Sequence, residues 1–323
     1  MAHELATASD MAFTGDSPWH QLGNRLPPKQ PIEVWQKAAN MDWEIKQSDV
    51  LFNAQSENGN MLNLRSNPEA TVLYRSDNFA PLSVVSPRYK VVQPREVLGF
   101  YRDLVSAGGF ALETAGILRG GRKMWALAKT GQETMLSGND RVKAYLLLAT
   151  SCDGSLATTA QFTSIRVVCN NTLQMAVGQS KGAVRVPHST TFDPAQVKQE
   201  LGLGLTAWDT FQASIKTLSN RKVNKFEVMS FLVDVLGDSA LPLNEQPNQR
   251  GIQTVYGLYS GGGKGSELAS AKGTAWGLVN GITEWVDTHR RARSQDYRLD
   301  SAWFGQGAAI KERALQHALA LAA

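Results

Sequence analysis

Residues 110–130 read FALETAGILRGGRKMWALAKT, and this stretch decides the fold. Two apolar segments, Phe110–Arg119 and Arg122–Thr130, flank Gly120-Gly121, the glycine pair that a two-residue hairpin turn favours. Further strands are predicted over Val142–Thr150 and Ala157–Thr163, with the turn residues Asp153-Gly154 between them. The succession of short strands predicts an antiparallel β-sheet.

A helix is expected to follow the last of these strands. Beginning near Ser164, the segment Ile165–Val177 carries apolar residues at a spacing that fits one helical face. Strands followed by this helix give a β-β-β-α-like core. The predicted fold class is α+β, an antiparallel sheet packed on helices with a helical C-terminal part.

The rest of the chain divides into three regions. Residues 1–30 contain the breakers Ser17-Pro18 and Pro27-Pro28 and are expected to form a loosely attached N-terminal arm. Residues 31–190 form the α+β core with the basic sheet, and residues 191–323 form a mainly helical C-terminal region. Other predicted elements are helices over Ile32–Ala39 and Arg95–Val105, strands over Trp43–Phe52, Thr71–Ser76, Leu82–Val85 and Tyr89–Val92, and C-terminal helices from Asp193-Pro194 towards Leu218, over Asn224–Leu236, Thr274–Arg291 and Ser301–Leu321.

Composition narrows the class of protein. The 323 residues are 42% hydrophobic and 19% charged, which is ordinary for a folded domain. Two cysteines, Cys152 and Cys169, provide neither a disulfide framework nor a zinc cluster. The sequence shows no signal peptide and no apolar run long enough for a membrane span. A cytoplasmic protein without a cofactor is expected.

Basic residues are concentrated in the middle of the chain. From Arg88 to Arg185 there are 13 Lys and Arg residues against 6 Asp and Glu, an excess of seven, whereas the whole chain carries only +4. Such an excess on a predicted sheet indicates a polyanionic partner, most often a nucleic acid.

Nine cations are the candidate nucleic-acid ligands, and three aromatic residues among them are candidates for stacking on bases. The cations are Arg119, Arg122, Lys123, Lys129, Arg141, Lys143, Arg166, Lys181 and Arg185, and the aromatic residues are Trp125, Tyr145 and Phe162. Each ring is also a candidate for the core, because aromatic side chains dominate core burial. Arg166 is expected in the first turn of the predicted helix, where a bound phosphate or a buried carboxylate such as Glu113 or Asp153 would compensate its charge.

The sequence gives little support for catalysis or metal binding. Cys152 with His188 as its base is one conceivable nucleophile, but a free cysteine at a strand end is usually an inert core residue. The glycine-rich run Gly261–Gly265 does not match a phosphate-binding P-loop and is expected to be a mobile loop or a linker. Arg290, Arg291, Arg293 and Arg298 either extend the DNA surface or pair with Glu284, Asp287 and Asp296. No metal site and no enzyme are predicted.

Several segments resemble a known family, the phage/plasmid-like proteins described as domain of unknown function 932. They are PWHQLG near the N-terminus, RYKVVQPREVLGFYRDL, ETAGILRGGRKMWALAK, YLLLATSCDGSLATTAQFTSIRVVCNNTL, KGTAWGLVNGITEWVDTHRR and AWFGQGAAIKERALQHAL. The resemblance spans nearly the whole chain and implies no catalytic residues. At the level of fold alone, strands ending in a helix also resemble phage and Rad-type single-strand annealing proteins, which form rings or filaments.

These observations favour a single-stranded DNA-binding, strand-annealing protein that acts in phage or plasmid recombination or replication. The expected partners are single-stranded nucleic acid and other copies of the chain, assembled as a homo-oligomer without membrane contact. Two alternatives stay open: a host-interaction or counter-defence protein that binds an acidic bacterial protein, and a nucleic-acid-processing enzyme.

Overall fold

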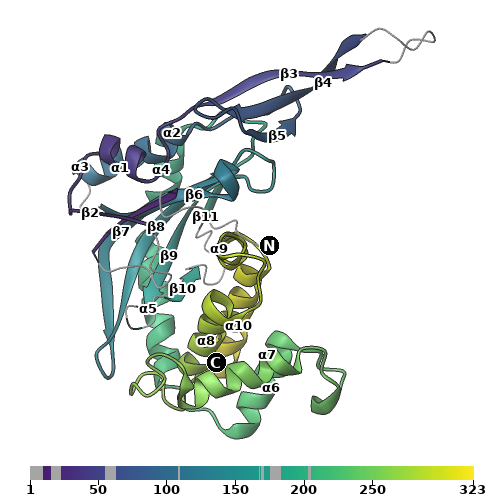
Figure 1. Cartoon of the computed structure of the whole chain (residues 1–323). Helices are drawn as coiled ribbons and strands as arrows, with labels where there is room; N and C mark the ends of the chain where they lie inside the picture. The colour runs from purple at the N-terminus through teal and green to yellow at the C-terminus, as the bar shows by residue number, and fades with distance from the viewer. Residues whose placement is uncertain are drawn as a thin grey trace.

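The structure, a computed structural model, joins an antiparallel β-sheet to a set of C-terminal helices (Figure 1). It describes residues 10–15, 23–54, 63–107, 110–166, 168, 171–174, 183–202 and 205–323. The predicted α+β class, the antiparallel sheets and the helical C-terminal part are confirmed.

Within the described residues, the central sheet has eight strands. Its order is β10-β9-β8-β7-β6-β1-β2, with β11 paired to β9. The strands are β1 (Met11–Thr14), β2 (Asn24–Leu26), β6 (Ala111–Leu118), β7 (Lys123–Leu136), β8 (Asp140–Ser151), β9 (Thr158–Arg166), β10 (Asn171–Gln174) and β11 (Ala183–Val186). All neighbours are antiparallel except the β1–β2 pair. Because β1 and β2 belong to this sheet, part of the expected N-terminal arm is built into the core region.

The predicted hairpin exists, but its turn is longer than two residues. β6 and β7 pair from Leu118 with Lys123, and Arg119–Gly121 form a short 3-10 turn between them. Arg119, Gly120 and Gly121 have φ of 56°, 69° and 102°, a run of left-handed backbone that glycine tolerates best. The glycine pair therefore predicts the position of the turn correctly, and Arg119 is a third turn residue with left-handed backbone.

The predicted helix over Ile165–Val177 is wrong in the part that the structure describes. β9 continues through Arg166, and Asn171–Gln174 form β10, which pairs with it in antiparallel register. The apolar spacing of this segment fits a helix as well as a strand, whereas Thr172 and Leu173 suit a strand next to a partner. The β-β-β-α succession is thus replaced by further strands.

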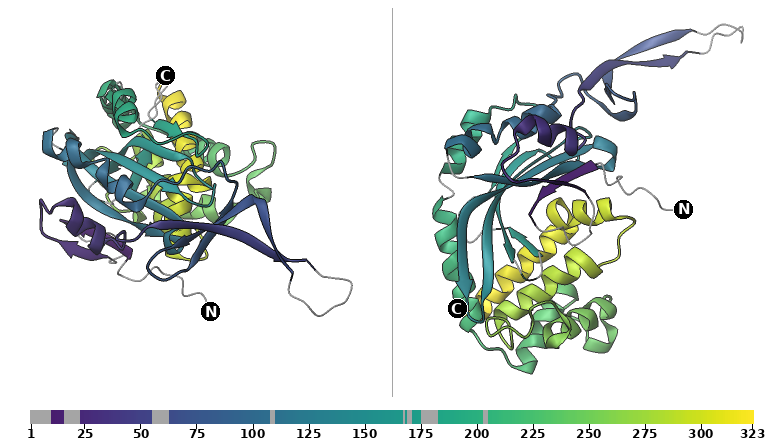
Figure 2. Two further views of the ribbon diagram at one scale, coloured as in Figure 1. Left: turned by 90° about the horizontal axis from the view of Figure 1, so that it is seen from above. Right: turned by 60° about the vertical axis from the view of Figure 1, so that its left-hand side comes forward.

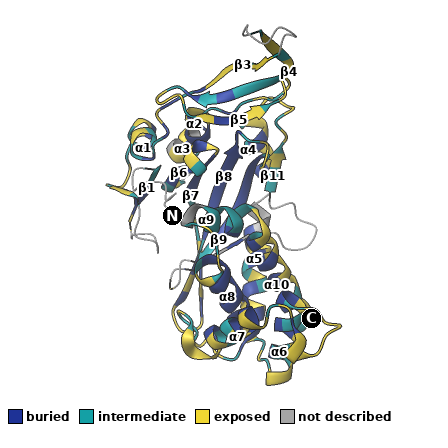
Figure 3. Cartoon of the chain, turned by 45° about the vertical axis from the view of Figure 1, so that its right-hand side comes forward, coloured by how far each residue is buried: buried dark blue, intermediate teal, exposed yellow. Residues whose placement is uncertain are grey.

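A second, three-stranded sheet projects from the body. It comprises β3 (Ile45–Asn53), β4 (Leu64–Arg75) and β5 (Pro81–Val85), in that order. Figure 2 shows the distal parts of β3 and β4 extending away from the rest of the chain. Most of their side chains are exposed, as the colouring of Figure 3 shows. Tyr89–Val92, predicted as a strand, lies outside both sheets.

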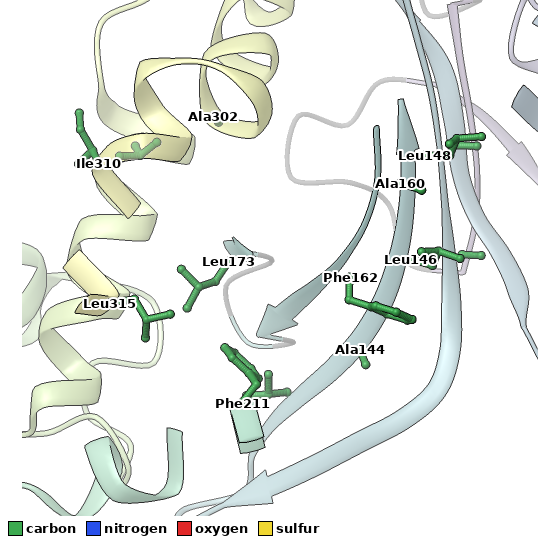
Figure 4. Packing of buried hydrophobic residues seen from close by; sticks show 14 of the residues in the cluster. Ala144, Leu146, Leu148, Ala160, Phe162, Leu173, Phe211, Ala302, Ile310 and Leu315 are labelled. Atoms are coloured by element: carbon green, nitrogen blue, oxygen red, sulfur yellow. The ribbon is translucent and has the colours of Figure 1, made fainter. Parts of the chain in front are cut away.

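Helices cover both faces of the central sheet. On one face, apolar residues of β7, β8 and β9 pack against α2 (Pro94–Gly99), α4 (Pro194–Gly202) and α5 (Leu205–Asn220). Phe162 of β9 and Phe211 of α5 belong to this core and are shown in Figure 4. On the other face, Trp125, Leu127 and Leu147 pack against α9 (Gln295–Phe304).

The remaining helices complete the two ends of the molecule. The region before the central strands contributes α1 (Ile32–Ala38) and α3 (Arg102–Ala107); the predicted helix over Arg95–Val105 is divided between α2 and α3. The C-terminal region adds α6 (Lys225–Leu236), α7 (Gln249–Gly257), α8 (Ala275–Glu284) and α10 (Gln306–Ala322), with π-helical turns over Leu258–Gly262 and Trp285–His289. Leu173 points from β10 towards α10, where Leu315 lies (Figure 4). Within the described residues, every helix is too short or too polar to span a bilayer.

Candidate nucleic-acid interface

The hairpin turn carries three of the predicted ligands, and two of them are engaged by carboxylates. Lys123 is buried and forms an ion pair with Asp300 of α9. The Nη1 atom of Arg119 lies 3.6 Å from Asp153 and 3.9 Å from Asp300. Arg122 is exposed at the turn. Lys123 is therefore corrected from a groove residue to a buried structural cation.

Asp153 is held in its charged form beside this turn. Burial acts to raise the pKa of its carboxyl, but hydrogen bonds from the Ser155 side chain and backbone N–H and the nearby Arg119 outweigh burial and keep the pKa below its usual range. Arg119 thus faces a stable negative charge, which reduces its availability for a phosphate.

Arg166 lies at the opposite end of the sheet and is only 2% exposed. Its Nε atom lies 2.7 and 2.9 Å from the two oxygens of Asp140, which is fully buried. Its Nη2 atom donates to the Gly265 carbonyl at 3.0 Å. The expectation of a buried carboxylate partner is right in kind, but the partner is Asp140, and Arg166 is no surface ligand.

Asp140 connects the sheet to the glycine-rich loop and α8. Besides Arg166, it accepts hydrogen bonds from Ser270 Oγ at 2.6 Å and Trp276 Nε1 at 3.2 Å. Because Arg166 also binds the loop carbonyl of Gly265, the loop is held against the end of β9. Its expected role as a mobile closing loop is therefore not supported by these contacts.

The predicted cations do not share one surface. Lys123 pairs in register with Ser151 at one end of β8, and Arg141 and Lys143 lie at the other end. Ten residues of strand separate positions 141 and 151, which corresponds to roughly 33 Å. Arg141 lies 4.0 Å from Glu133, and Lys129 lies 2.7 Å from Glu113. The predicted basic sheet face is therefore wrong: these cations are distributed over distant positions, and many are paired.

Two further predicted ligands lie elsewhere. Arg185 is exposed on β11, opposite Thr159 of β9. Lys181 lies outside the described residues. Arg122 and Arg185 are the exposed predicted cations that form no ion pair in the described part of the chain.

The three predicted stacking residues are core residues. Trp125, Tyr145 and Phe162 are 2%, 3% and 4% exposed. Burial raises the pKa of the Tyr145 hydroxyl far above its usual range. Trp125 packs edge-on against Trp303 of α9, with the ring centroids 4.8 Å apart. The prediction that these rings stack on bases is therefore wrong, because both sheet faces are covered.

The possible cysteine nucleophile, Cys152, is also a core residue. Cys152 is buried, and burial raises the pKa of its thiol to about 12. The two ring nitrogens of His188 lie 3.0 Å from the carbonyl oxygens of Lys90 and Leu156. Within the described ranges, no group of three metal-binding side chains occurs.

A group of arginines gathers at the start of α9. Four arginines line one pocket of about 180 Å³ together with Tyr297 and Ser301; they are Arg290, Arg291, Arg293 and Arg298. Of the acidic residues expected to neutralise them, Asp287 pairs with Lys311 at 2.8 Å, and Glu284 accepts a hydrogen bond from the Lys264 N–H. No ion pair to these four arginines occurs in the described part of the chain.

This pocket adjoins the hairpin turn through Tyr297. The guanidinium carbons of Arg119 and Arg293 lie 5.3 and 5.8 Å from the centre of the Tyr297 ring. We call Arg122 and the four pocket arginines the arginine strip; Arg119, which Asp153 and Asp300 engage, lies between them beside Tyr297. The sequence signal for the strip is the run Arg290-Arg291-Ala292-Arg293 just before the N-cap Ser294. From the sequence, this run either extends the DNA surface or pairs with nearby acidic residues.

A comparison with protein families identifies this chain. Residues 81–303, more than half of its length, match the family described as Domain of unknown function (DUF932). The chain belongs to the DUF932 family. The family description names no activity, and neither curated proteins nor solved structures give a match. The matched range contains both the hairpin turn and the arginine pocket, so the strip lies within the DUF932 region.

Proposed function

We propose that this protein binds single-stranded DNA through the arginine strip and promotes strand annealing, without cutting or joining strands. The observation that carries the proposal is the pocket of four arginines at the start of α9, with which no described carboxylate forms an ion pair. Guanidinium groups bind phosphate oxygens through paired N–H donors, and neutralised phosphates supply the main part of sequence-independent affinity.

The geometry favours a flexible single strand over a duplex. The strip bends from a hollow beside α9 around Tyr297 to the exposed Arg122 at the hairpin turn. A single strand follows such a path because its backbone is flexible.

Annealing needs no chemistry at the protein. The strip would hold phosphates and leave base edges free to pair with a second strand, which agrees with the buried thiol and the buried aromatic rings. This proposal places the protein in the cytoplasm of a bacterial cell, in phage or plasmid recombination or replication, and includes assembly with further copies of the chain.

The test is the salt dependence of oligonucleotide binding. For single strands, the logarithm of the binding constant falls with log salt by about 0.7 per neutralised phosphate. The double variant R122Q/R293Q should reduce that slope by about 1.4 if each arginine contacts one phosphate. Both side chains are exposed, so the fold should be unaffected.

The matched control is K225Q/R250Q, which removes two exposed positive charges from α6 and α7. Its slope should equal that of the unsubstituted protein. Equal slopes for all three proteins, or no binding of single strands at about 50 mM salt, where phosphate contacts are strong, would contradict the proposal. Annealing is measured separately, as the rate at which two complementary labelled strands pair.

A further inference from the structure

The arginine pocket differs from the rest of the strip because its arginines surround a hollow. Its four arginines come from nine consecutive residues, Arg290 to Arg298, and surround a hollow of about 180 Å³. That volume is several times the roughly 30 Å³ that one water occupies in the liquid. The hollow therefore has room for a compact anion.

Part of the donor capacity of the pocket is used by the protein, and part is not. Arg290 donates to Ser301 Oγ at 2.9 Å and to the Gln306 side chain, and Arg298 donates to the Thr288 carbonyl. These bonds fix the two guanidinium groups at the pocket wall. The Nε atom of Arg298 is buried and has no hydrogen-bond partner among the residues that the structure describes, which is costly for a charged donor unless a ligand or water supplies one.

The electrostatics of the pocket favour a dianion. Burial lowers the pKa of Arg298, which reflects a charge removed from water without a compensating carboxylate. The pocket also borders the first turn of α9, where Ser294 caps the helix, and the positive end of the helix dipole adds to the arginines. Arg291 and Arg293 are exposed at its rim and available to an incoming ligand.

We propose that this pocket binds the terminal phosphate of a DNA strand, as a phosphate monoester dianion. The inference rests on the proposed function and specifies which phosphate of the bound strand occupies the pocket. A monoester carries about −1.5 to −2 charges at pH 7 and three acceptor oxygens. A phosphodiester within a strand carries a single charge and has a substituent on either side, so it can present fewer free oxygens and less charge to the four arginines.

A bound strand end would set the register of the strand on the protein. The terminal phosphate sits among the four arginines, and the following phosphates pass Tyr297 towards Arg122. The protein would thereby prefer processed ends over continuous strands, which is a property that phosphate neutralisation alone does not give.

The experiment compares oligothymidylates that differ only at their ends. Twelve-nucleotide strands with a central fluorophore carry a 5′-phosphate, a 3′-phosphate or hydroxyls at both ends, and their affinities are measured by polarisation. We expect one phosphorylated end to bind about tenfold more tightly than the hydroxyl form at pH 7.5. This gain should largely disappear at pH 5, since the second pKa of the monoester is about 6.

The variant R291Q/R293Q should lose the gain, and K225Q/R250Q should keep it. Equal affinity for all three strands overturns the inference and leaves the proposed function standing if they bind. If no strand binds, the proposed function fails. Calorimetry with thymidine 5′-monophosphate then tests whether the pocket binds a phosphate monoester at all. If the nucleotide binds and the R291Q/R293Q variant abolishes this binding, the pocket is a monoester site for a free nucleotide, and the strand-end assignment is overturned. If the nucleotide does not bind, the site itself is overturned.

Discussion

At the scale of single residues, the charge of a side chain in the sequence does not tell whether water, a ligand or a carboxylate will compensate it. Arg166 illustrates this, because a bound phosphate and a buried carboxylate such as Glu113 or Asp153 were both expected as its partner, and the structure pairs it with Asp140. The relevant partner is 26 positions away in sequence and adjacent only because Val142 and Arg166 lie in register on neighbouring strands. Periodicity and local composition contain no information of this kind.

Removing the Asp140 charge should destabilise the protein strongly. In Asp140→Asn, the buried Arg166 guanidinium loses its counter-charge, and breaking a buried pair in this way costs about 3–5 kcal/mol. The free energy of unfolding in urea measures the effect. Asp49→Asn, an exposed carboxylate on β3, serves as control and should change stability by less than about 0.5 kcal/mol. Equal midpoints for the two variants would contradict a structural role of the pair.

At the scale of elements, strands with strong local signals were predicted well. The strands β6, β8 and β9 and the helices α1 and α6 lie close to their predicted ranges, whereas β7 continues to Leu136, six residues beyond the predicted end at Thr130. The helix over Ile165–Val177 failed because its apolar spacing did not distinguish helix from strand, and pairing with β9 decides the outcome for Asn171–Gln174. The basic sheet face failed for a related reason: α9 covers a face that the strand pattern alone left open.

The hairpin turn offers a test with a matched neighbour. A Cβ at Gly121 would lie 2.7 Å from the Trp43 ring, and φ there is 102°. A Cβ at Gly120 meets nothing within 4 Å, at a φ of 69°. Gly120→Ala should therefore show only the left-handed penalty of about 1 kcal/mol, whereas Gly121→Ala should lose clearly more stability. Thermal melts of the two variants compare them directly, and equal losses would show that the Trp43 contact is unimportant.

At the scale of the whole molecule, the sheet and the C-terminal helices form one packed unit. A single apolar cluster contains residues from α1 and β7 through to α8 and α10. Polar contacts also join the regions before and after residue 191. Lys123 forms an ion pair with Asp300. The Arg166–Asp140 pair is hydrogen-bonded to the Gly265 carbonyl and to the Trp276 ring N–H. The division into regions 31–190 and 191–323, which the sequence suggested, therefore describes composition more than independent folding.

Calorimetry should consequently show one cooperative transition for the full chain. With a shared core, neither region retains its buried surface when the other unfolds, so the calorimetric and van't Hoff enthalpies should agree. Urea titrations followed by tryptophan fluorescence and by circular dichroism should give coincident midpoints. Two resolved transitions would indicate that the regions unfold separately.

The Asp140 contacts also impose an order on how the chain matures on the ribosome. Asp140 and Arg166 emerge early, but Ser270 and Trp276, which donate to the same carboxylate, are more than 100 residues further along. At about 5–20 residues per second, roughly 5–20 seconds separate their synthesis. Throughout that interval, the end of β9 stays solvated, and the nascent sheet acquires its lasting form only when translation nears completion.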